Sequence, residues 1–264
     1  MKKSFLMMAA VIGALCVCAA EVQDLSAVAK WSKSKNVKAA DKGFTVTGRT
    51  MLLSSTLIPV DAAKKYKISV DAKSVANLDK KAWFFIGYQP YDANKRAIQP
   101  WSSFVVKNTA TELAAAAKKG DKVIKVKNGA AFIKIAHAVI VFNTKDDLSD
   151  LPNKNIVARG VTAIAKKDGF WEITLVKPVT KDFAAGTKIR QHSDSGYLYA
   201  INRAVVGDTV KTFSGITNGF TDNGAWNGSK WPKGTAFFRV VILSNWQSSA
   251  ANVIEYKNIK LTIE

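Results

Sequence analysis

The sequence contains only two cysteines, Cys16 and Cys18, and both lie near its start. A basic beginning is followed by an apolar run over residues 5–17 and by small residues up to Ala20, which is the order found in secretory signal peptides. We therefore expect cleavage near Ala20 and a secreted or periplasmic protein. The cleaved chain would have no cysteine, which excludes disulfide bonds and thiol nucleophiles.

A lipid anchor is the alternative interpretation of this segment, because both cysteines lie close to the expected cleavage point. Lipoprotein signals place a small residue directly before the cysteine, whereas Leu15 precedes Cys16 and Val17 precedes Cys18. Soluble secretion is therefore favoured. The apolar run is too short to span a bilayer, and no later segment approaches about 18 unbroken apolar residues, so we expect no membrane span.

Catalytic groups are also scarce. The chain has two histidines, His137 and His192, and it shows no Cys/His zinc spacing, no phosphate-binding glycine loop and no Gly-x-Ser-x-Gly nucleophile elbow. Three aspartates over residues 146–150 fall in one turn, which does not indicate the two facing carboxylates of a glycoside hydrolase. The sequence favours binding over catalysis, without a cofactor.

Negative charge is in short supply: 39 lysines and arginines stand against 20 acids, giving a formal net charge of +19 at pH 7. Such an excess attracts polyanions. For an exported protein we expect an acidic glycan or an envelope surface as the partner, and no nucleic acid, because the lysines are dispersed and form no recognition motif. The alternative is that the charge serves solubility alone.

Strand patterns dominate the chain. Polar and apolar residues alternate over 43–48, 66–72 and 122–127, and longer apolar runs over 82–88, 138–142 and 236–243 predict strands buried on both faces. Only Thr111–Ala117 and Asp61–Lys65 suggest a helical turn or two. Many short strands separated by turn residues predict an all-β protein built as a sandwich or barrel.

The middle of the chain differs from its flanks. It opens on Thr111-Glu112-Leu113-Ala114, has Gly120-Asp121 before an alternating strand, and closes on Gly186-Thr187-Lys188-Ile189. Residues 108–191 thus resemble the small β module of phage tail and bacterial surface proteins, which implies an interaction or spacer role. The flanks, 21–107 and 192–264, supply about nine strands between them, the number of a jelly roll. We expect one discontinuous β-sandwich with an inserted β-rich module.

The joined flanks resemble the carbohydrate-binding jelly rolls, with a galactose-binding-like fold, of bacterial secreted proteins. The patterns that carry this resemblance lie at 65–73, 85–94, 234–242 and 254–261. The resemblance implies a non-catalytic β-sandwich that binds a polysaccharide or a cell-surface glycan. In such jelly rolls the closing strand commonly carries an acid that holds a structural calcium. Here Lys257 and Asn258 occupy that stretch, so we assign no metal.

Sugar-binding sites use aromatic rings that stack on the apolar faces of sugars, so an aromatic residue among polar turn residues is a candidate. Trp226 and Trp231 lie in a Gly/Asn-rich loop, although Trp231 leads directly into a strand, which favours a structural role for it. Trp83 and Trp171 lie in apolar strands and are expected in the core. The predicted ligand-binding set is Trp226, Trp231, Trp101, Tyr91, Asn223 and Trp246.

Two other functions are kept as alternatives. A basic jelly-roll polysaccharide lyase abstracts a proton with Tyr or His while a cation neutralises the sugar carboxylate. Arg190, His192, Tyr197 and Tyr199 supply these residue types, but the arginine-rich strand and Gln-x-His pattern of alginate-type lyases are missing. The third possibility is a structural envelope or surface protein that assembles through the inserted module.

Overall fold

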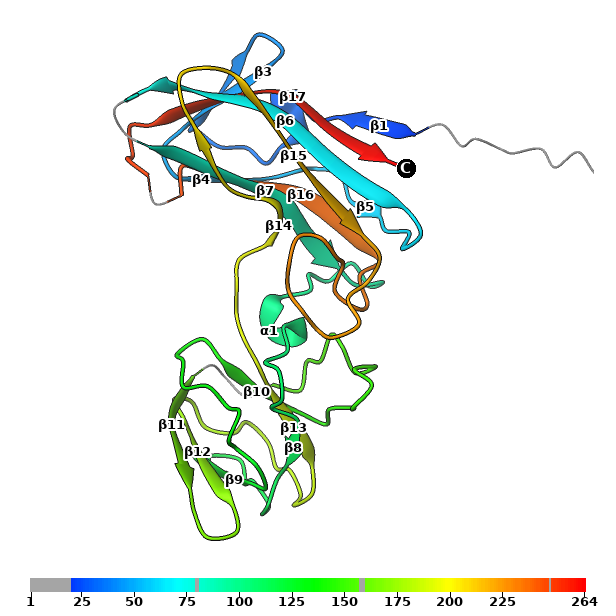
Figure 1. Ribbon diagram of the computed structural model, residues 1–264, viewed down its shortest axis with the longest axis vertical. Coiled ribbons are helices and arrows are strands. Elements are labelled where there is room, and N and C mark those ends of the chain that lie inside the picture. Colours follow the sequence, from blue (N-terminus) through cyan, green and yellow to red (C-terminus); the bar gives the residue numbers. More distant parts are fainter. Residues whose placement is uncertain (1–19, 79–80, 157–159, 247) are drawn as a thin grey trace, which may run out of the picture.

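The structure is a computed structural model that describes residues 20–78, 81–156, 160–246 and 248–264. The expected signal peptide lies almost wholly outside the described residues. The fold is an antiparallel β-sandwich with a smaller β-rich module beyond one of its ends (Figure 1). The expected all-β class is confirmed, and so is the expected sandwich.

The sandwich consists of two antiparallel sheets. The first has the order β15 (Lys211–Asn218), β6 (Lys65–Ala76), β17 (Val253–Ile263), β3 (Gly43–Thr47), β2 (Val37–Ala40), with β1 (Glu21–Asp24) also paired to β17. The second has the order β14 (Leu198–Val206), β7 (Ala82–Tyr91), β16 (Phe237–Ser244), β4 (Thr50–Leu53), with β5 (Ile58–Pro59) also paired to β16. Both sheets contain strands from either side of the module in the sequence.

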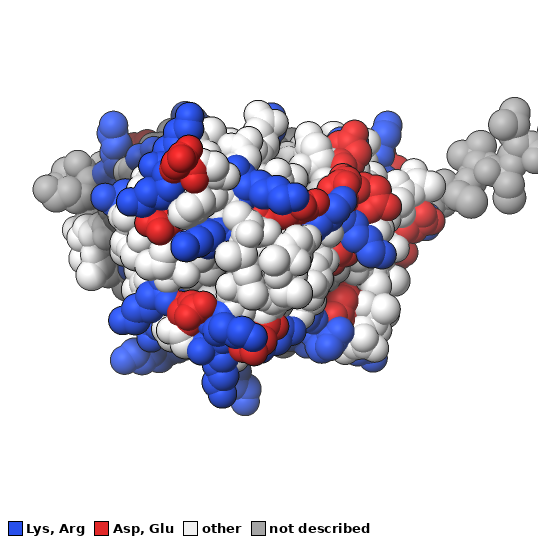
Figure 2. All heavy atoms as spheres, turned by 90° about the horizontal axis from the view of Figure 1, so that it is seen from below, with Lys and Arg blue, Asp and Glu red and all other residues white. Residues whose placement is uncertain are grey.

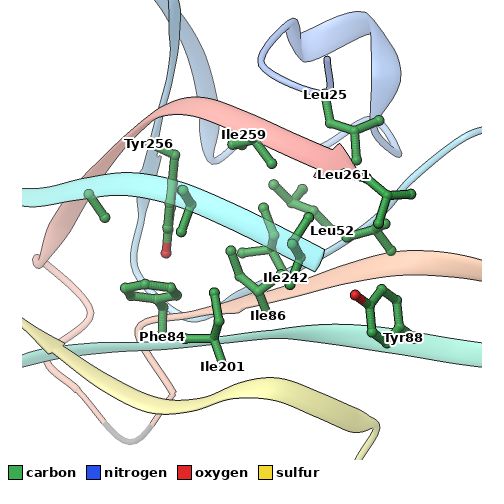
Figure 3. Close-up of a cluster of buried hydrophobic side chains, with 14 of the residues drawn as sticks. Leu25, Leu52, Phe84, Ile86, Tyr88, Ile201, Ile242, Tyr256, Ile259 and Leu261 are labelled. Atoms are coloured by element: carbon green, nitrogen blue, oxygen red, sulfur yellow. The ribbon is translucent and has the colours of Figure 1, made fainter. Parts of the chain in front are cut away.

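Alternation along the strands builds the core between these sheets. In β7, Phe84, Ile86 and Tyr88 are fully buried, and they meet side chains such as Tyr256 and Leu261 from β17 (Figure 3). The intervening residues of β7 point to the opposite face of the sheet. This outward row matters for function, because it is not covered by the first sheet.

The module has its own hydrophobic cluster, formed by residues between Leu113 and Ile189. One of its three-stranded sheets has the order β10 (Val139–Phe142), β13 (Lys188–His192), β8 (Thr111–Glu112), and the other has the order β11 (Val161–Lys166), β12 (Trp171–Leu175), β9 (Val123–Val126). Phe142 stacks on Phe183 with ring centroids 3.8 Å apart. The main core, in contrast, draws only on residues 25–88 and 198–263.

Polar contacts join the module to the sandwich. The chain leaves β7 through the short helix α1 (Pro100–Ser103) and returns into β14. The Lys154 ammonium, from a module loop, lies 3.1 Å from the Asp92 carboxylate in the turn after β7. The N–H of Asn153 donates to the Ser102 carbonyl at 2.8 Å. These contacts hold the linking segments beside the end of the second sheet.

Two sequence-based expectations are wrong. The segment Thr111–Ala117 is not helical: it begins with β8, and its Leu113 and Ala117 N–H groups bond to the Thr187 and Phe183 carbonyls. These backbone bonds to residues far along the chain hold the alanines in an extended segment and override their helix propensity. The second error concerns β7, which is not buried on both faces, since Phe85 is only partly buried on its outer side. The segment Asp61–Lys65 forms a turn, with a bond from the Lys64 N–H to the Asp61 carbonyl.

We predict that Trp231→Ala strongly destabilises the protein. The Trp231 side chain is fully buried, and its ring centroid lies 5.3 Å from that of Tyr66, 5.0 Å from that of Tyr88 and 4.9 Å from that of Phe238. Truncating a buried Trp to Ala costs about 3–5 kcal/mol. Urea unfolding measures the change. The partly exposed Trp246→Ala is the matched control, and an equal loss in both variants would contradict this packing.

Candidate functional site

A groove lies on the outer face of the second sheet. Its volume is about 560 Å³, within the range of about 300–1,000 Å³ found for ligand pockets. The lining residues come from four strands of the sheet and from the segments beside them: Met51, Phe85, Ser195, Gly196, Tyr197, Tyr199, Leu243 and Trp246. Its walls are mainly apolar and aromatic. Exposed apolar surface of this kind is typical of interaction sites.

The floor of the groove depends on how closely β14 approaches β7. Gly87 on β7 pairs with Tyr199, and a Cβ at Gly87 would overlap the Leu198 carbonyl oxygen. Only glycine permits this approach. The register also shifts between Tyr199 and Ile201, which indicates a bulge that redirects the strand. As a result the ring of Tyr199 packs on Phe85, with centroids 4.7 Å apart.

Two further contacts fix the side walls. The Tyr197 hydroxyl donates to the Met51 sulfur at 3.0 Å, and the Tyr197 and Tyr199 rings meet edge to face at 6.3 Å. At the other wall the Arg49 guanidinium lies over the indole of Trp246, 3.2 Å from its centroid. Both walls are therefore held before a ligand arrives, which lowers the entropic cost of binding.

A second, more polar hollow of about 200 Å³ continues the groove toward α1 and shares Ser195, Gly196 and Tyr197 with it. Its other lining residues are Gln89, Gln99, Pro100, Trp101, Asp194 and Trp226. The Gln99 side chain makes no capping bond to α1. The Trp226 indole donates to the Gly196 carbonyl at 2.9 Å and thereby steadies the segment common to both hollows.

The structure brings together three of the six predicted ligand-binding residues. Trp246 lines the apolar groove, and Trp101 and Trp226 line the polar hollow. Trp231 has no exposed surface and belongs to the core, which corrects its place in the ligand-binding set. The other two lie outside the lining of both hollows.

Tyr91 and Asn223 have local roles. Tyr91 is half-buried at the end of β7 with the Arg239 guanidinium 5.8 Å from its ring centroid. The Asn223 side chain is exposed, and its oxygen accepts bonds from Thr221 and from the Ala225 N–H, which shapes the turn. Trp83 and Trp171, expected in the core, are only partly buried.

Sequence reasoning missed most of the groove floor, namely Met51, Phe85 and Leu243. The signal was present in the run Trp83-Phe84-Phe85, which offers large apolar side chains to both faces of one strand. An antiparallel sheet commonly buries one face only. In a two-sheet sandwich such a strand therefore indicates either a third layer or a binding surface.

Two of the four residues that motivated a lyase, Arg190 and His192, lie in a buried network, whereas the other two, Tyr197 and Tyr199, line the groove. The Arg190 Nε–H donates to His192 Nε2 at 2.7 Å, and its Nη2–H donates to the Asp150 carboxylate at 2.5 Å. Since Nε2 accepts, His192 carries its proton on Nδ1, which donates to the Trp101 carbonyl at 2.9 Å. Both Arg190 and His192 are at least 98% buried. The network positions α1 and the polar hollow, and neither side chain reaches the groove.

Burial controls ionisation in this network and in the groove. Burial, assisted by the Arg190 charge, lowers the pKa of His192 to about 3, so the imidazole is neutral at physiological pH. Burial raises the pKa of Asp150, but hydrogen bonds from Asn153 and Arg190 outweigh it and leave that pKa below its usual value. In the groove, burial raises the pKa of Tyr197 and of Tyr199, so both phenols keep their protons at neutral pH.

The stretch of the closing strand where carbohydrate-binding jelly rolls commonly carry a calcium ligand does not suit a cation in this chain. The Glu255 carboxylate lies 3.2 Å from the Lys257 ammonium and 3.6 Å from that of Lys73. Two lysines at this carboxylate would repel a divalent cation. No cluster of three or more acidic, histidine or cysteine residues that could hold a metal occurs in the described part of the chain.

Positive charge does not gather into one patch on the module end of the molecule (Figure 2). Figure 2 shows lysine and arginine side chains interspersed with acidic and uncharged residues at the module end of the molecule. That face therefore presents no unbroken basic surface. Among the residues that the structure describes, no helix is long and apolar enough to cross a membrane.

Comparisons with protein-family models, with curated proteins and with solved structures find no significant match. The structure supports an all-β sandwich, and the resemblance to carbohydrate-binding jelly rolls rests on the residue patterns alone. Any functional inference depends on the groove itself.

The buried imidazole predicts a pH dependence of stability. The pKa of His192 in the folded protein is about 3, below its unfolded value near 6.5, so the unfolded chain binds one more proton between these values. The unfolding free energy should fall as the pH drops from about 6.5 toward 3, by about 1.4 kcal/mol per pH unit from this group.

Urea unfolding between pH 4 and 6 tests this dependence. His192→Asn should reduce the slope of unfolding free energy against pH by up to about 1.4 kcal/mol per pH unit, which is the contribution of one proton. The substitution should also lower stability at neutral pH. His137→Asn, at the exposed histidine, is the matched control. An unchanged slope in His192→Asn would show that the imidazole does not carry this dependence.

Proposed function

We propose that this chain is a secreted, non-catalytic carbohydrate-binding β-sandwich protein that binds acidic glycans in the groove on the outer face of its second sheet. The observation that carries the proposal is that the aromatic floor of the groove adjoins the more polar hollow beside α1. A sugar chain has apolar ring faces and polar edges, and it needs both kinds of surface side by side.

The aromatic half suits the ring faces of a sugar. Phe85, Tyr199 and Trp246 offer rigid rings that lose little side-chain entropy on binding. Their positions are fixed by packing within the sheet and by the Arg49 contact, as a preorganised site requires.

The polar half suits hydroxyl groups. The amide of Gln99 and the carboxylate of Asp194 line it beside two indoles. Because the two hollows share the segment 195–197, one ligand can fill both, which favours a chain of at least two sugar units over a monosaccharide.

Binding without turnover is supported by the ionisable groups at hand. Proton abstraction by a lyase needs a group that is unprotonated at working pH. The two phenols of the groove keep their protons, and His192 is buried against Trp101. The net positive charge would add long-range attraction to acidic glycans, screened over about 8 Å at physiological salt.

We predict that Trp246→Ala and Tyr199→Ala each weaken glycan binding by at least about tenfold. Aromatic residues at the centre of a binding site commonly contribute about 2 kcal/mol or more. A glycan array with the cleaved protein identifies ligands first, and titration calorimetry then gives the dissociation constant of each variant.

Trp83→Ala is the matched control, because Trp83 lies on the same strand as Phe85 but outside the groove lining. It should bind as the unaltered protein does. No retention on any glycan would sink the proposal and favour the structural surface protein, whereas release of unsaturated sugar products would favour the lyase.

A further inference from the structure

We infer that Arg49 is the residue that recognises the acid group of the ligand, a carboxylate or sulfate on a sugar bound in the groove. This inference rests on the proposed function and adds the group that separates acidic from neutral glycans. The evidence is the position of Arg49, the contact of its guanidinium with Trp246 and the lack of a hydrogen bond or ion pair to it among the described residues.

Arg49 is not itself a lining residue of the groove, but it is next to two elements that are. It directly precedes β4, whose Met51 lines the groove, and its guanidinium carbon lies 3.2 Å from the centroid of the Trp246 ring. At this distance the cation lies on one face of the indole. Trp246 therefore connects the two functions, as a wall of the groove and as the platform that holds the charge.

Stacking leaves the hydrogen-bonding capacity of the guanidinium unused. The five N–H donors lie in the guanidinium plane and point outward from its edges, so face contact with an indole consumes none of them. Within the described part of the chain, Arg49 forms no hydrogen bond or ion pair. Its parallel N–H groups can therefore donate two hydrogen bonds to the two oxygens of a carboxylate or sulfate.

None of the residues that line the apolar groove is acidic. Asp194 lines the polar hollow, and it is absent from the lining of the apolar groove where Trp246 lies. The acid group of a bound sugar would therefore meet Arg49 at the aromatic half, while the hydroxyl groups of the next unit meet the polar half.

The same sheet provides a matched control. Arg203 on β14 also lies over a tryptophan, with its guanidinium carbon 4.1 Å from the centroid of Trp83, and both arginines are exposed. The difference lies in the stacked tryptophan: Trp246 lines the groove, whereas Trp83 does not. Arg203→Gln removes the same charge from the same kind of stacked pair, so it reports the contribution of general electrostatic attraction.

The test compares a uronic-acid oligosaccharide with its methyl ester, which has the same rings without the charge. Titration calorimetry at 0.15 M salt gives the ratio of the two affinities. We expect the unaltered protein to prefer the acid by about tenfold or more, as for a hydrogen-bonded charge pair. Arg49→Gln should bring the ratio near one with ester binding retained, and Arg49→Lys should restore part of it.

Three results would overturn the inference. An unchanged ratio in Arg49→Gln would show that another group recognises the acid, while the proposed function would stand. If Arg203→Gln lowers the ratio of acid to ester affinity as much as Arg49→Gln does, the preference for the acid comes from net charge alone. If the unaltered protein binds neither oligosaccharide and no glycan is retained on the array, the proposed function fails together with this inference.

Discussion

The groove exists because β7 carries large apolar side chains on both of its faces. One row, with Phe84 and Tyr88, forms the core of the sandwich, and the other row places Phe85 on the outer surface. Two sheets can bury only one face of each, so the second row needs another partner. Burial of that remaining apolar surface by a ligand is the physical basis of the proposed binding.

The surroundings of β7 shape this surface into a binding site. Gly87 lets β14 approach closely, the bulge in β14 directs Tyr199 onto Phe85, and Trp246 closes the far wall under Arg49. The module contributes indirectly. Its buried bonds from Arg190 to His192 and from His192 to the Trp101 carbonyl fix the helix that borders the polar hollow.

The sequence allowed the class of fold to be predicted, since the strand patterns located the central strands of both sheets, β6 and β17 in the first and β7 and β16 in the second. It also pointed to Trp246, Trp101 and Trp226, because each follows or lies among polar turn residues. For Trp231 the position directly before a strand favoured a structural role, and the structure buries its ring, although Trp231 also stood in the predicted ligand-binding set. The floor of the groove was missed because the outward direction of Phe85, and its meeting with Tyr199 about a hundred residues later, depend on strand pairing that no local pattern encodes.

The most direct test of the central claim is an NMR titration that follows the indole N–H signals of the seven tryptophans while an acidic oligosaccharide is added. Binding in the groove should shift the signals of Trp246, Trp226 and Trp101 and leave those of Trp31, Trp83, Trp171 and Trp231 in place. Shifts confined to Trp83 or Trp171 would place the ligand elsewhere and contradict the account.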